Sequence, residues 1–379
     1  MKTRFVSSMA EINPQAWQAL DIGNSPFLRY AFLQALEQFD CVGEKTGWIP
    51  HHAIIEDEVS ETLLGVMPLY LKYNSYGELV FDWAWADAYQ RIGRPYYPKL
   101  VSAIPYTPVT SQRILFNASA DKSQVQTVLF EMLIEEAESR QMSSIHCLFP
   151  EKDLAEQMEK AKFVTRMGCQ FQWFNREYQS FEDFVSHFSS RKRKNVNKER
   201  QRVKEQGVDI QLLRGDQIEA DLWPVIYDFY RITFMEKGGY PTFTLEFFQH
   251  IAQLMGEQLL IVMAIYQGQY VACAICYQDE QCLYGRHWGS FEKFHSLHFE
   301  VCYYQGIEYA IEHGIKRFEP GAQGEHKVSR GFLPTATWSS HWIKDDDFAS
   351  AIRQFIDKET VHMQQYITQV NKHSPFKTI

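Results

Sequence analysis

A strongly basic segment is the first feature of the chain whose residue types suggest chemistry. Eight of the fourteen residues from 191 to 204 are Lys or Arg, although the chain has a net charge of −9. Clustered cations on an acidic protein indicate a site for a polyanion such as a phosphate, a nucleotide or RNA. A solvated helix face between two domains is the alternative. On a helix at 189–206, Val196 and Val203 would form a narrow apolar stripe against a neighbour. The expected phosphate-binding residues are Arg191, Arg193, Lys194, Lys198 and Arg202.

A glycine-containing loop near residue 320 is a second possible anion site. Gly321 and Gly324 let the backbone approach a ligand closely, because glycine tolerates positive φ. Lys327 and Arg330 follow within two helical turns, and backbone donors at a helix start would complete an anion cradle. The glycine spacing differs from that of a P-loop. A tight turn with surface charges is the alternative.

Aromatic and acidic residues in the first half of the chain suggest a ligand pocket. Rings beside carboxylates could hold a sugar or an amine, although aromatic rings more often fill a core. The long irregular stretch at 89–113 favours a functional loop. The expected acceptor-binding residues are Asp82, Trp85, Asp87, Tyr97, Lys99 and Tyr106.

The second half of the chain shows which elements must position these residues. The expected strands are 208–213, 259–266, 270–277, 282–288 and 316–319, and the expected helices are 217–237, 245–255 and 297–313. Connectors of hairpin length predict that the strands at 259–288 form an antiparallel meander. Gly314 ends the third helix in the position typical of a C-cap.

The first half repeats this order less cleanly. The expected helices are 26–39, 123–140 and 151–162, and the expected strands are 52–56, 63–73, 78–85 and 144–149. The strand-helix-strand order at 115–149 parallels that at 282–319. We therefore predict an α/β (α+β) fold with two related domains, residues 1–170 and 171–379. Each would be a mixed, mainly antiparallel sheet flanked by helices.

Three antiparallel strands followed by a helix and one more strand resemble the GNAT acyltransferase fold. In that fold the fourth and fifth strands splay apart and expose backbone donors for the acyl donor. Two copies in one chain resemble the FemAB-like family of predicted N-acyltransferases and peptidoglycan biosynthesis or recognition proteins. The motifs that carry this resemblance are IPYTPV at 104–109, SRKRK at 190–194, LHFEVCYY at 297–304, FEPGAQGEHK at 318–327 and RGF at 330–332. The resemblance runs over nearly the whole chain but defines no substrate.

The resemblance implies transfer of an aminoacyl or acyl group from aminoacyl-tRNA or acyl-CoA to an amine, such as that of a peptidoglycan precursor. The second domain would bind the donor and the first domain the acceptor. Aminolysis needs a route for the proton of the amine and stabilisation of the oxyanion. The residues expected to converge for this purpose are His287, His298, Glu300, Glu319 and His326. For each of them by itself, a structural role is the favoured interpretation, and only the set as a whole points to catalysis.

Two alternatives stay open at this point. One is an acetyl-CoA-dependent N-acetyltransferase of a small amine, and the other is a non-catalytic binding protein on a GNAT scaffold. The GNAT pyrophosphate signature has only a partial match at 286–291, which ends in Phe, and this favours aminoacyl-tRNA without excluding CoA. No tightly bound cofactor is expected, and the oligomeric state is left open.

Composition and short motifs set the remaining bounds. No apolar run reaches membrane-spanning length and no signal-like segment begins the chain, so we expect a cytoplasmic protein. Seven scattered cysteines fit a reducing compartment, and Cys273 and Cys276 alternate within a strand as packing residues. His295 and His298 lack a defined third ligand, so no metal is expected.

Overall fold

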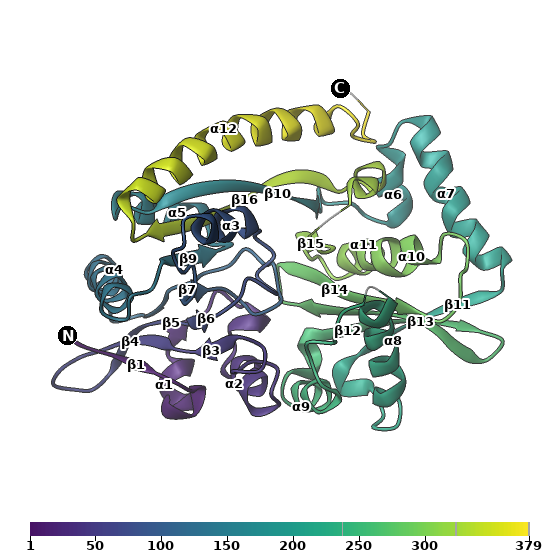
Figure 1. Ribbon diagram of the computed structural model, residues 1–379. Helices are drawn as coiled ribbons and strands as arrows, with labels where there is room; N and C mark the ends of the chain where they lie inside the picture. Colours follow the sequence, from purple (N-terminus) through teal and green to yellow (C-terminus); the bar gives the residue numbers. More distant parts are fainter. Residues whose placement is uncertain (237, 323, 378–379) are drawn as a thin grey trace. The chain divides into compact units, whose positions relative to one another are not determined.

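In the computed structural model, residues 1–236, 238–322 and 324–377 are described (Figure 1). The chain divides into two compact units, and each is considered by itself. The first unit comprises Met1–Cys169 and Ala336–Gln365, and the second comprises Gln170–Thr335 and Tyr366–Ile379. Residues 336–365 therefore belong to the first unit and not, as we expected, to the second domain.

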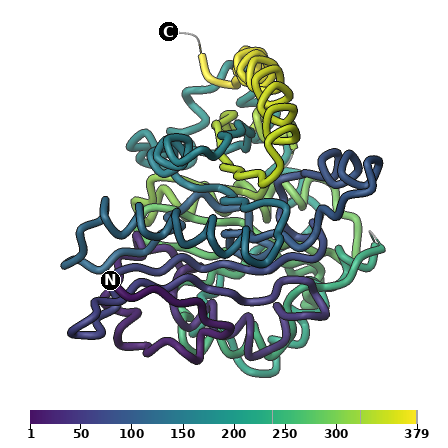
Figure 2. Tube along the Cα trace, turned by 60° about the vertical axis from the view of Figure 1, so that its left-hand side comes forward, coloured from purple at the N-terminus to yellow at the C-terminus, as the bar shows by residue number. Residues whose placement is uncertain are grey.

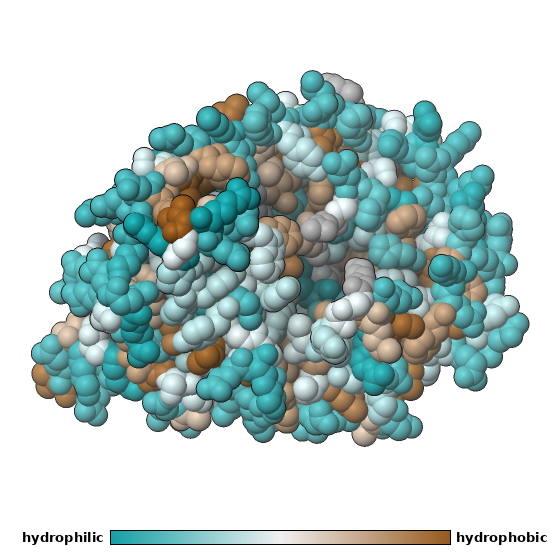
Figure 3. Space-filling view, viewed as in Figure 1, coloured by the Kyte–Doolittle hydropathy of each residue, from teal (hydrophilic) through white to brown (hydrophobic). Residues whose placement is uncertain are grey.

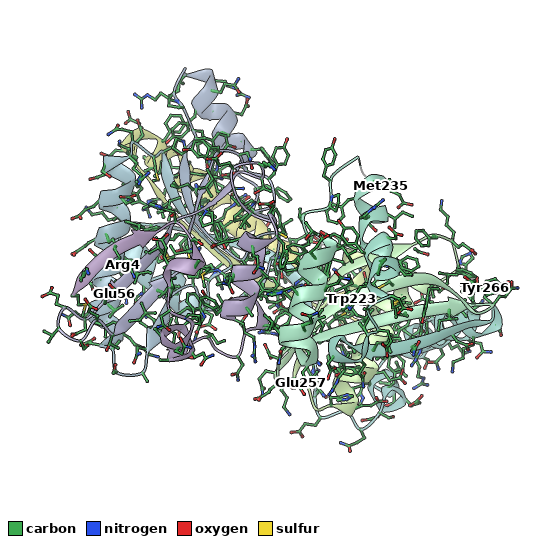
Figure 4. All side chains as sticks on the ribbon, turned by 90° about the horizontal axis from the view of Figure 1, so that it is seen from below. Arg4, Glu56, Trp223, Met235, Glu257 and Tyr266 are labelled. Carbon is green, nitrogen blue, oxygen red and sulfur yellow. The ribbon has the colours of Figure 1, made fainter. Side chains whose placement is uncertain are left out.

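The first unit contains an antiparallel sheet with the strand order β1-β4-β5-β8-β2. Its strands are β1 (Lys2–Val6), β4 (His52–Glu56), β5 (Leu63–Met67), β8 (Leu115–Asn117) and β2 (Leu20–Asp21). Arg4 on β1 lies beside Glu56 on β4 (Figure 4), and their Nη2 and Oε1 atoms are 2.8 Å apart. This ion pair ties the edge strand to its neighbour.

Five further strands of the first unit follow the order β16-β9-β7-β6-β3. They are β16 (Leu333–Ile343), β9 (Ser144–Leu148), β7 (Lys99–Ser102), β6 (Tyr70–Lys72) and β3 (Trp48–Pro50). Residues 339–343 of β16 pair with β9, which explains why this late segment belongs to the first unit. The single strand expected at 63–73 is instead two strands in different sheets. Pro68 lies between β5 and β6, and proline has no N–H to continue a ladder.

The helices of the first unit are α1 (Pro14–Gln18), α2 (Tyr30–Gln38), α3 (Trp83–Arg91), α4 (Lys122–Ser139), α5 (Lys152–Lys160) and the first part of α12 (Asp346–Asn371), with short 3-10 helices at Met9–Glu11 and Pro26–Leu28. Helix α4 lies across the strands (Figure 2), and its Leu129 and Leu133 share a core with Ile55 of β4 and Ile145 of β9.

The strand expected at 78–85 was wrong, because the segment is a loop followed by α3. Trp85 and Tyr89, four residues apart, lie on one face of this helix and are both buried. They pack with Ile352 and Ile356 of α12, a second contact that holds residues 336–365 in the first unit.

The second unit is built on the order β11-β12-β13-β14-β15-β10. Its strands are β11 (Val208–Arg214), β12 (Leu259–Tyr266), β13 (Gln269–Gln278), β14 (Cys282–Ser290), β15 (Arg317–Glu319) and the end of β10 (Val164–Phe174). The expected antiparallel meander is present as β12, β13 and β14. Strand β15 then pairs parallel to β14, and only through Cys282–Tyr284. Beyond Tyr284 strand β14 continues to Ser290 without β15, which is the splayed arrangement that the GNAT resemblance implied.

Helices cover both faces of this sheet. They are α6 (Phe181–Ser186), α7 (Ser190–Glu205), α8 (Trp223–Glu236), α9 (Leu245–Met255), α10 (Leu297–Phe299) and α11 (Gln305–Glu312), with a π-helix at Glu300–Tyr304 and 3-10 helices at Gly215–Gln217, Gly256–Gln258 and Glu325–Arg330. The single helix expected at 297–313 is thus interrupted by a π-helical turn, a feature frequent at functional sites. Of the helix expected at 217–237, α8 covers Trp223–Glu236, and Lys237 lies outside the described residues.

Candidate functional site

One face of the basic helix α7 is anchored inside the second unit. Val196 and Val203 are buried, as their seven-residue spacing predicted. Glu199 and Arg200 lie between them on the same face. Arg200 Nη2 lies 2.6 Å from Glu308 Oε2 and 3.0 Å from Glu300 Oε1. Arg200 is therefore a structural cation.

The other face of α7 carries four of the five predicted phosphate-binding residues, whereas Arg193 is three residues from Val196 and lies toward the anchored side. Arg191, Lys194 and Lys198 are exposed, and Arg193 and Arg202 are partly exposed. None of these five has a carboxylate partner within 4 Å among the residues that the structure describes. The surface over α7 is hydrophilic (Figure 3). Arg191, Arg193 and Lys194 also stand in or next to the first helical turn, where the helix dipole disfavours positive charge. A bound anion would relieve both their mutual repulsion and this unfavourable placement.

The loop after β15 passes beside β14 at the point where the two strands separate. Gly321 and Gly324 have φ values of +94° and +116°, so both adopt the conformation that favours glycine. A Cβ on Gly285 of β14 would stand 3.4 Å from the Cα of Pro320. This close approach holds the loop against the strand. Gln323 of the predicted anion cradle lies outside the described residues.

The side chain of Lys327 is hydrogen-bonded to the backbone of this glycine loop. Its Nζ donates a 2.8 Å hydrogen bond to the carbonyl oxygen of Gly321, and the side chain is buried. Burial lowers the pKa of Lys327 to about 8. A partly desolvated ammonium beside a glycine loop can stabilise a developing oxyanion.

Arg330, predicted to bind the donor, is instead used inside the protein. Its Nη2 donates to Glu199 Oε1 at 2.7 Å and its Nη1 donates to the carbonyl oxygen of His326 at 2.7 Å. Its guanidinium lies 3.4 Å from the ring centroid of Phe299. Arg330 therefore fastens the Glu325–Arg330 turn to α7 and positions Lys327 indirectly.

Two of the predicted histidines come together beside this turn. The ring centroids of His298 and His326 are 6.1 Å apart, and Tyr303 OH lies 2.9 Å from His326 Nε2. Burial lowers the pKa of His298 to about 4 and lowers that of His326 below its ordinary value, with Arg330 adding to the second shift. Both imidazoles are therefore neutral near pH 7 and can accept a proton.

Glu319 ends β15 next to the strand separation and is fully enclosed. Its Oε1 lies 3.3 Å from Arg317 Nε, and its Oε2 lies 3.6 Å from Arg286 Nη2. Burial raises the pKa of Glu319, while the two arginines oppose that shift. The carboxylate is placed to neutralise the two arginines where the strands diverge.

The structure separates His287 and Glu300 from this group. Side chains alternate along β14, so His287 points to the opposite face of the sheet from Arg286 and Trp288. Its ring centroid lies 4.7 Å from that of Tyr230 and 6.4 Å from that of Phe248. Burial lowers the pKa of His287 to about 3. Glu300 is buried against Arg200. Both residues therefore have structural roles here, and the prediction that all five would converge was too broad.

Residues 286–290 of the partial CoA signature lie on β14, and Phe291 directly follows the strand. Gly289, its central glycine, packs against α8, and a Cβ there would come within 1.8 Å of the carbonyl oxygen of Phe229. This glycine serves helix-sheet packing and offers no phosphate-binding turn.

Sequence reasoning missed Trp288, Tyr303 and Glu199 as members of the site. The ring centroid of Trp288 is 5.2 Å from that of His298. Glu199 is the lone acid of the basic segment, and it is three residues from Val196 and four from Val203. That spacing already places it on the anchored face. Trp288 and Tyr303 carry no such signal, since only the strand separation brings them to the histidines.

The first unit has an open pocket of about 660 Å³. It is lined by Trp83, Ala86, Asp87, Gln90, Gly93, Arg94, Pro95, Tyr96 and Tyr97. Asp87 and Tyr97, predicted to bind the acceptor, are in this wall, and Asp82 and Lys99 are buried behind it. Trp85 is internal and its ring lies 4.9 Å from that of His341. Tyr106 is elsewhere, with its hydroxyl donating to the carbonyl oxygen of Cys41.

A buried hydrogen-bonded network lies behind the pocket. Lys99 Nζ donates to Glu78 Oε2 at 2.8 Å and to Asp82 Oδ2. Tyr96 OH donates to the same Asp82 oxygen at 2.6 Å and lies 3.3 Å from His146 Nε2. His146 Nδ1 is in turn 2.6 Å from His341 Nδ1, which connects β9 to β16. No residue spacing indicates this histidine pair, because its members are 195 residues apart in the chain.

The ionisable groups of this network predict a pH-dependent stability. Burial raises the pKa of Glu78 from 4.5 to about 7, although Lys99 opposes the shift. Below pH 4.5 the carboxyl group of Glu78 is protonated in both the folded and the unfolded chain. Between about pH 4.5 and 7 it is ionised in the unfolded chain but still protonated in the folded protein. The contribution of Glu78 to stability should therefore fall as pH rises through this window, while the buried His146, whose pKa is lowered to about 3, contributes in the opposite direction. We expect the urea midpoint of Glu78→Gln to rise relative to that of the wild type between pH 5 and 7, with Glu156→Gln on exposed α5 as the control. A difference from the wild type that does not change with pH would contradict the assignment.

No group of three His, Cys, Asp or Glu side chains in residues 1–236, 238–322 and 324–377 is arranged to hold a metal ion. No helix within these same ranges combines the length and the apolar composition that a membrane span requires.

The meander, the following helix and the parallel strand that separates from it define a GNAT-like fold of mixed α/β class, as predicted. FemX is a solved structure with this architecture, with a TM-score of 0.53 and 11% identity over 93% of this chain and 100% of that chain. L-PGS from Bacillus licheniformis has a TM-score of 0.53 and 10% identity over 91% of this chain and 97% of its own. A tandem GNAT protein from the clavulanic acid biosynthesis pathway gives a TM-score of 0.48 at 8% identity, covering 90% and 98%.

The FemAB-like family model, described as peptidoglycan biosynthesis/recognition, matches residues 8–378. The chain belongs to the FemAB-like family. No curated protein matches the chain significantly.

Proposed function

We propose that the protein is an N-acyltransferase that moves an aminoacyl group from aminoacyl-tRNA to an amine of a peptidoglycan precursor. The observation that carries this proposal is the outward face of α7. Four of the five predicted cations lie on this face, and none of the five has a carboxylate partner among the described residues. They share a compact unit with the separated strands and Lys327. The family membership supports a role in peptidoglycan chemistry. The donor is a co-substrate, and no tightly bound cofactor is part of the proposal.

The reaction is aminolysis of an ester. The amine nitrogen of the acceptor attacks the ester carbonyl carbon, a C–N bond forms, and the C–O bond to the ribose of the tRNA breaks. Lys327 stabilises the oxyanion, and Gly321 and Gly324 allow the backbone to approach the donor. Neutral His326, positioned by Tyr303, accepts the proton of the amine and returns it to the ribose oxygen.

We assign acceptor binding to the pocket of the first unit. Tyr97 and Trp83 offer ring surfaces, and Asp87 and Arg94 offer charged groups that can bind a sugar or a peptide. The buried Lys99 network stiffens the wall, because Tyr97 OH is hydrogen-bonded to Ser75 Oγ at 2.8 Å and Lys99 donates to the same hydroxyl.

An acetyl-CoA donor is the second candidate, because the separated strands of a GNAT-like fold are suited to a pantetheine arm. The absence of a phosphate-binding turn at Gly289 counts against it. The two donors make different predictions for binding, so one experiment distinguishes them.

The test is a paired titration with aminoacyl-tRNA and with acetyl-CoA at two salt concentrations. We expect Arg191→Glu/Lys194→Glu/Lys198→Glu to abolish tight tRNA binding. If all three contact phosphates, the dependence of log K on log salt should weaken by about 2, at about 0.7 for each contact to a single strand. The matched control is Lys122→Glu/Lys152→Glu/Lys160→Glu, three exposed lysines of the first unit. Unchanged tRNA affinity in the α7 variant, or binding of acetyl-CoA alone, would overturn the proposed donor.

A further inference from the structure

The segment between β6 and α3 has its polar residues inside and its apolar residues outside. Ser75, Glu78 and Asp82 are buried, and each accepts a hydrogen bond from the buried ammonium of Lys99. These anchors recur every three or four residues and fix the segment at several points. We call residues 73–83 the aromatic loop.

Large apolar side chains occupy the positions between these anchors and point to solvent. Tyr76 is 70% exposed and Phe81 is 56% exposed, and the ring centroids of Tyr76 and Trp83 are 5.1 Å apart. The other exposed members are Tyr73 and Leu79. Helix α3, which continues from the loop, projects from the strands of its unit (Figure 2), and pale and brown side chains interrupt the hydrophilic surface around it (Figure 3).

This polarity is opposite to that of an ordinary surface loop. Burying the polar residues and exposing the apolar ones both cost free energy. Desolvating an ion cluster is expensive, and well-packed apolar residues would fill the same space at least as stably. Exposing a group of apolar rings forfeits the gain from their burial. Such a patch marks a surface that contacts a protein or a membrane.

Size and composition favour a membrane over a protein partner. A stable protein interface takes about 20–30 residues from each side, and this loop presents only five apolar side chains. Tyr73, Tyr76 and Trp83 combine an apolar body with a polar tip, the composition of side chains at the boundary between lipid headgroups and acyl chains. The nearby exposed Arg91 and Arg94 are paired with Asp87 and Asp345, so the patch has little free charge.

We propose that the aromatic loop docks the protein on a lipid bilayer by inserting its rings at the headgroup boundary. Because the local charges are paired, binding should depend weakly on lipid charge and salt. The proposal goes beyond the acyltransferase activity, since it concerns where the protein resides, although Trp83 of the loop also lines the proposed acceptor pocket.

The test is co-sedimentation with phosphatidylcholine vesicles and with vesicles containing a quarter phosphatidylglycerol. We expect the wild type to bind both, and Phe81→Ser/Trp83→Ser to lose at least tenfold in affinity. Neither side chain belongs to the Lys99 network, so the thermal unfolding midpoint should stay unchanged. The matched control is Phe355→Ser/Val361→Ser, two exposed apolar residues of α12, which should bind like the wild type.

Three results would overturn the proposal. The first is no binding of the wild type to either vesicle, and the second is equal loss in the control. The third is self-association by light scattering that Phe81→Ser/Trp83→Ser abolishes while vesicle binding persists, since the loop would then bind a second copy of the chain.

Discussion

Replacing Lys99 by Met should lower the free energy of unfolding by about 3–5 kcal/mol. Lys99 has no solvent exposure and supplies the positive charge for Glu78 and Asp82, which are also buried. The variant removes the hydrogen-bonded cation from the buried Asp82 carboxylate and from Glu78, which leaves only the weaker electrostatic influence of Lys72. The penalty of this desolvated charge exceeds the loss of the hydrogen bonds themselves. Urea denaturation followed by circular dichroism measures the change.

A charge-free version of the network provides the decisive comparison. Lys99→Met/Glu78→Gln/Asp82→Asn removes the uncompensated charges and should recover most of the stability. Lys152→Met, at an exposed position of α5, should change it by no more than about 0.5 kcal/mol. If Lys99→Met matched Lys152→Met, or if the triple variant were no more stable than the single one, the buried ion cluster would not have the role assigned here.

Replacing Lys327 by Met should reduce kcat of aminoacyl transfer by about 10²–10³-fold with little change in KM, because an oxyanion donor acts mainly in the transition state. The measurement is transfer of a labelled aminoacyl group to a precursor amine. The pKa of Lys327 is lowered to about 8, so the ammonium form that donates is lost as pH rises through that value. The wild-type rate should therefore decline above about pH 8.

A conservative variant separates the effect of the positive charge at position 327 from the effect of the side chain's shape. Lys327→Arg keeps the positive charge at high pH, so the rate that remains should no longer decline above pH 8. Lys316→Met, at an exposed position just before β15, is the matched control and should keep full activity. Retention of kcat in Lys327→Met would remove Lys327 from the reaction, whatever the donor proves to be.

The sequence predicted best where a pattern is local and strongly periodic. The three runs at 259–288 are apolar and joined by short connectors, and they form β12, β13 and β14. Val196 and Val203 recur at seven residues and are buried on α7. In both places the periodicity and the tertiary packing demand the same arrangement.

Prediction failed where tertiary contacts override local pattern. Residues 78–85 have the apolar and aromatic composition of a strand, but buried Lys99 draws in Glu78 and Asp82 and leaves Phe81 in solvent. Arg330 has the composition of a phosphate ligand, and a single glutamate, Glu199, turns it inward. Such pairings join residues more than one hundred positions apart in the chain or reverse the usual polarity, so residue spacing does not reveal them.

The division of α7 into two faces has a consequence for how this protein can change over time. Glu199, Arg200 and the two valines fix the helix, so substitutions there are constrained by folding. The outward cations have no described carboxylate partners, and substitutions among them leave that anchoring intact. The anion preference that we propose for α7 can therefore diverge among relatives by surface mutation alone, at almost no thermodynamic penalty to the fold.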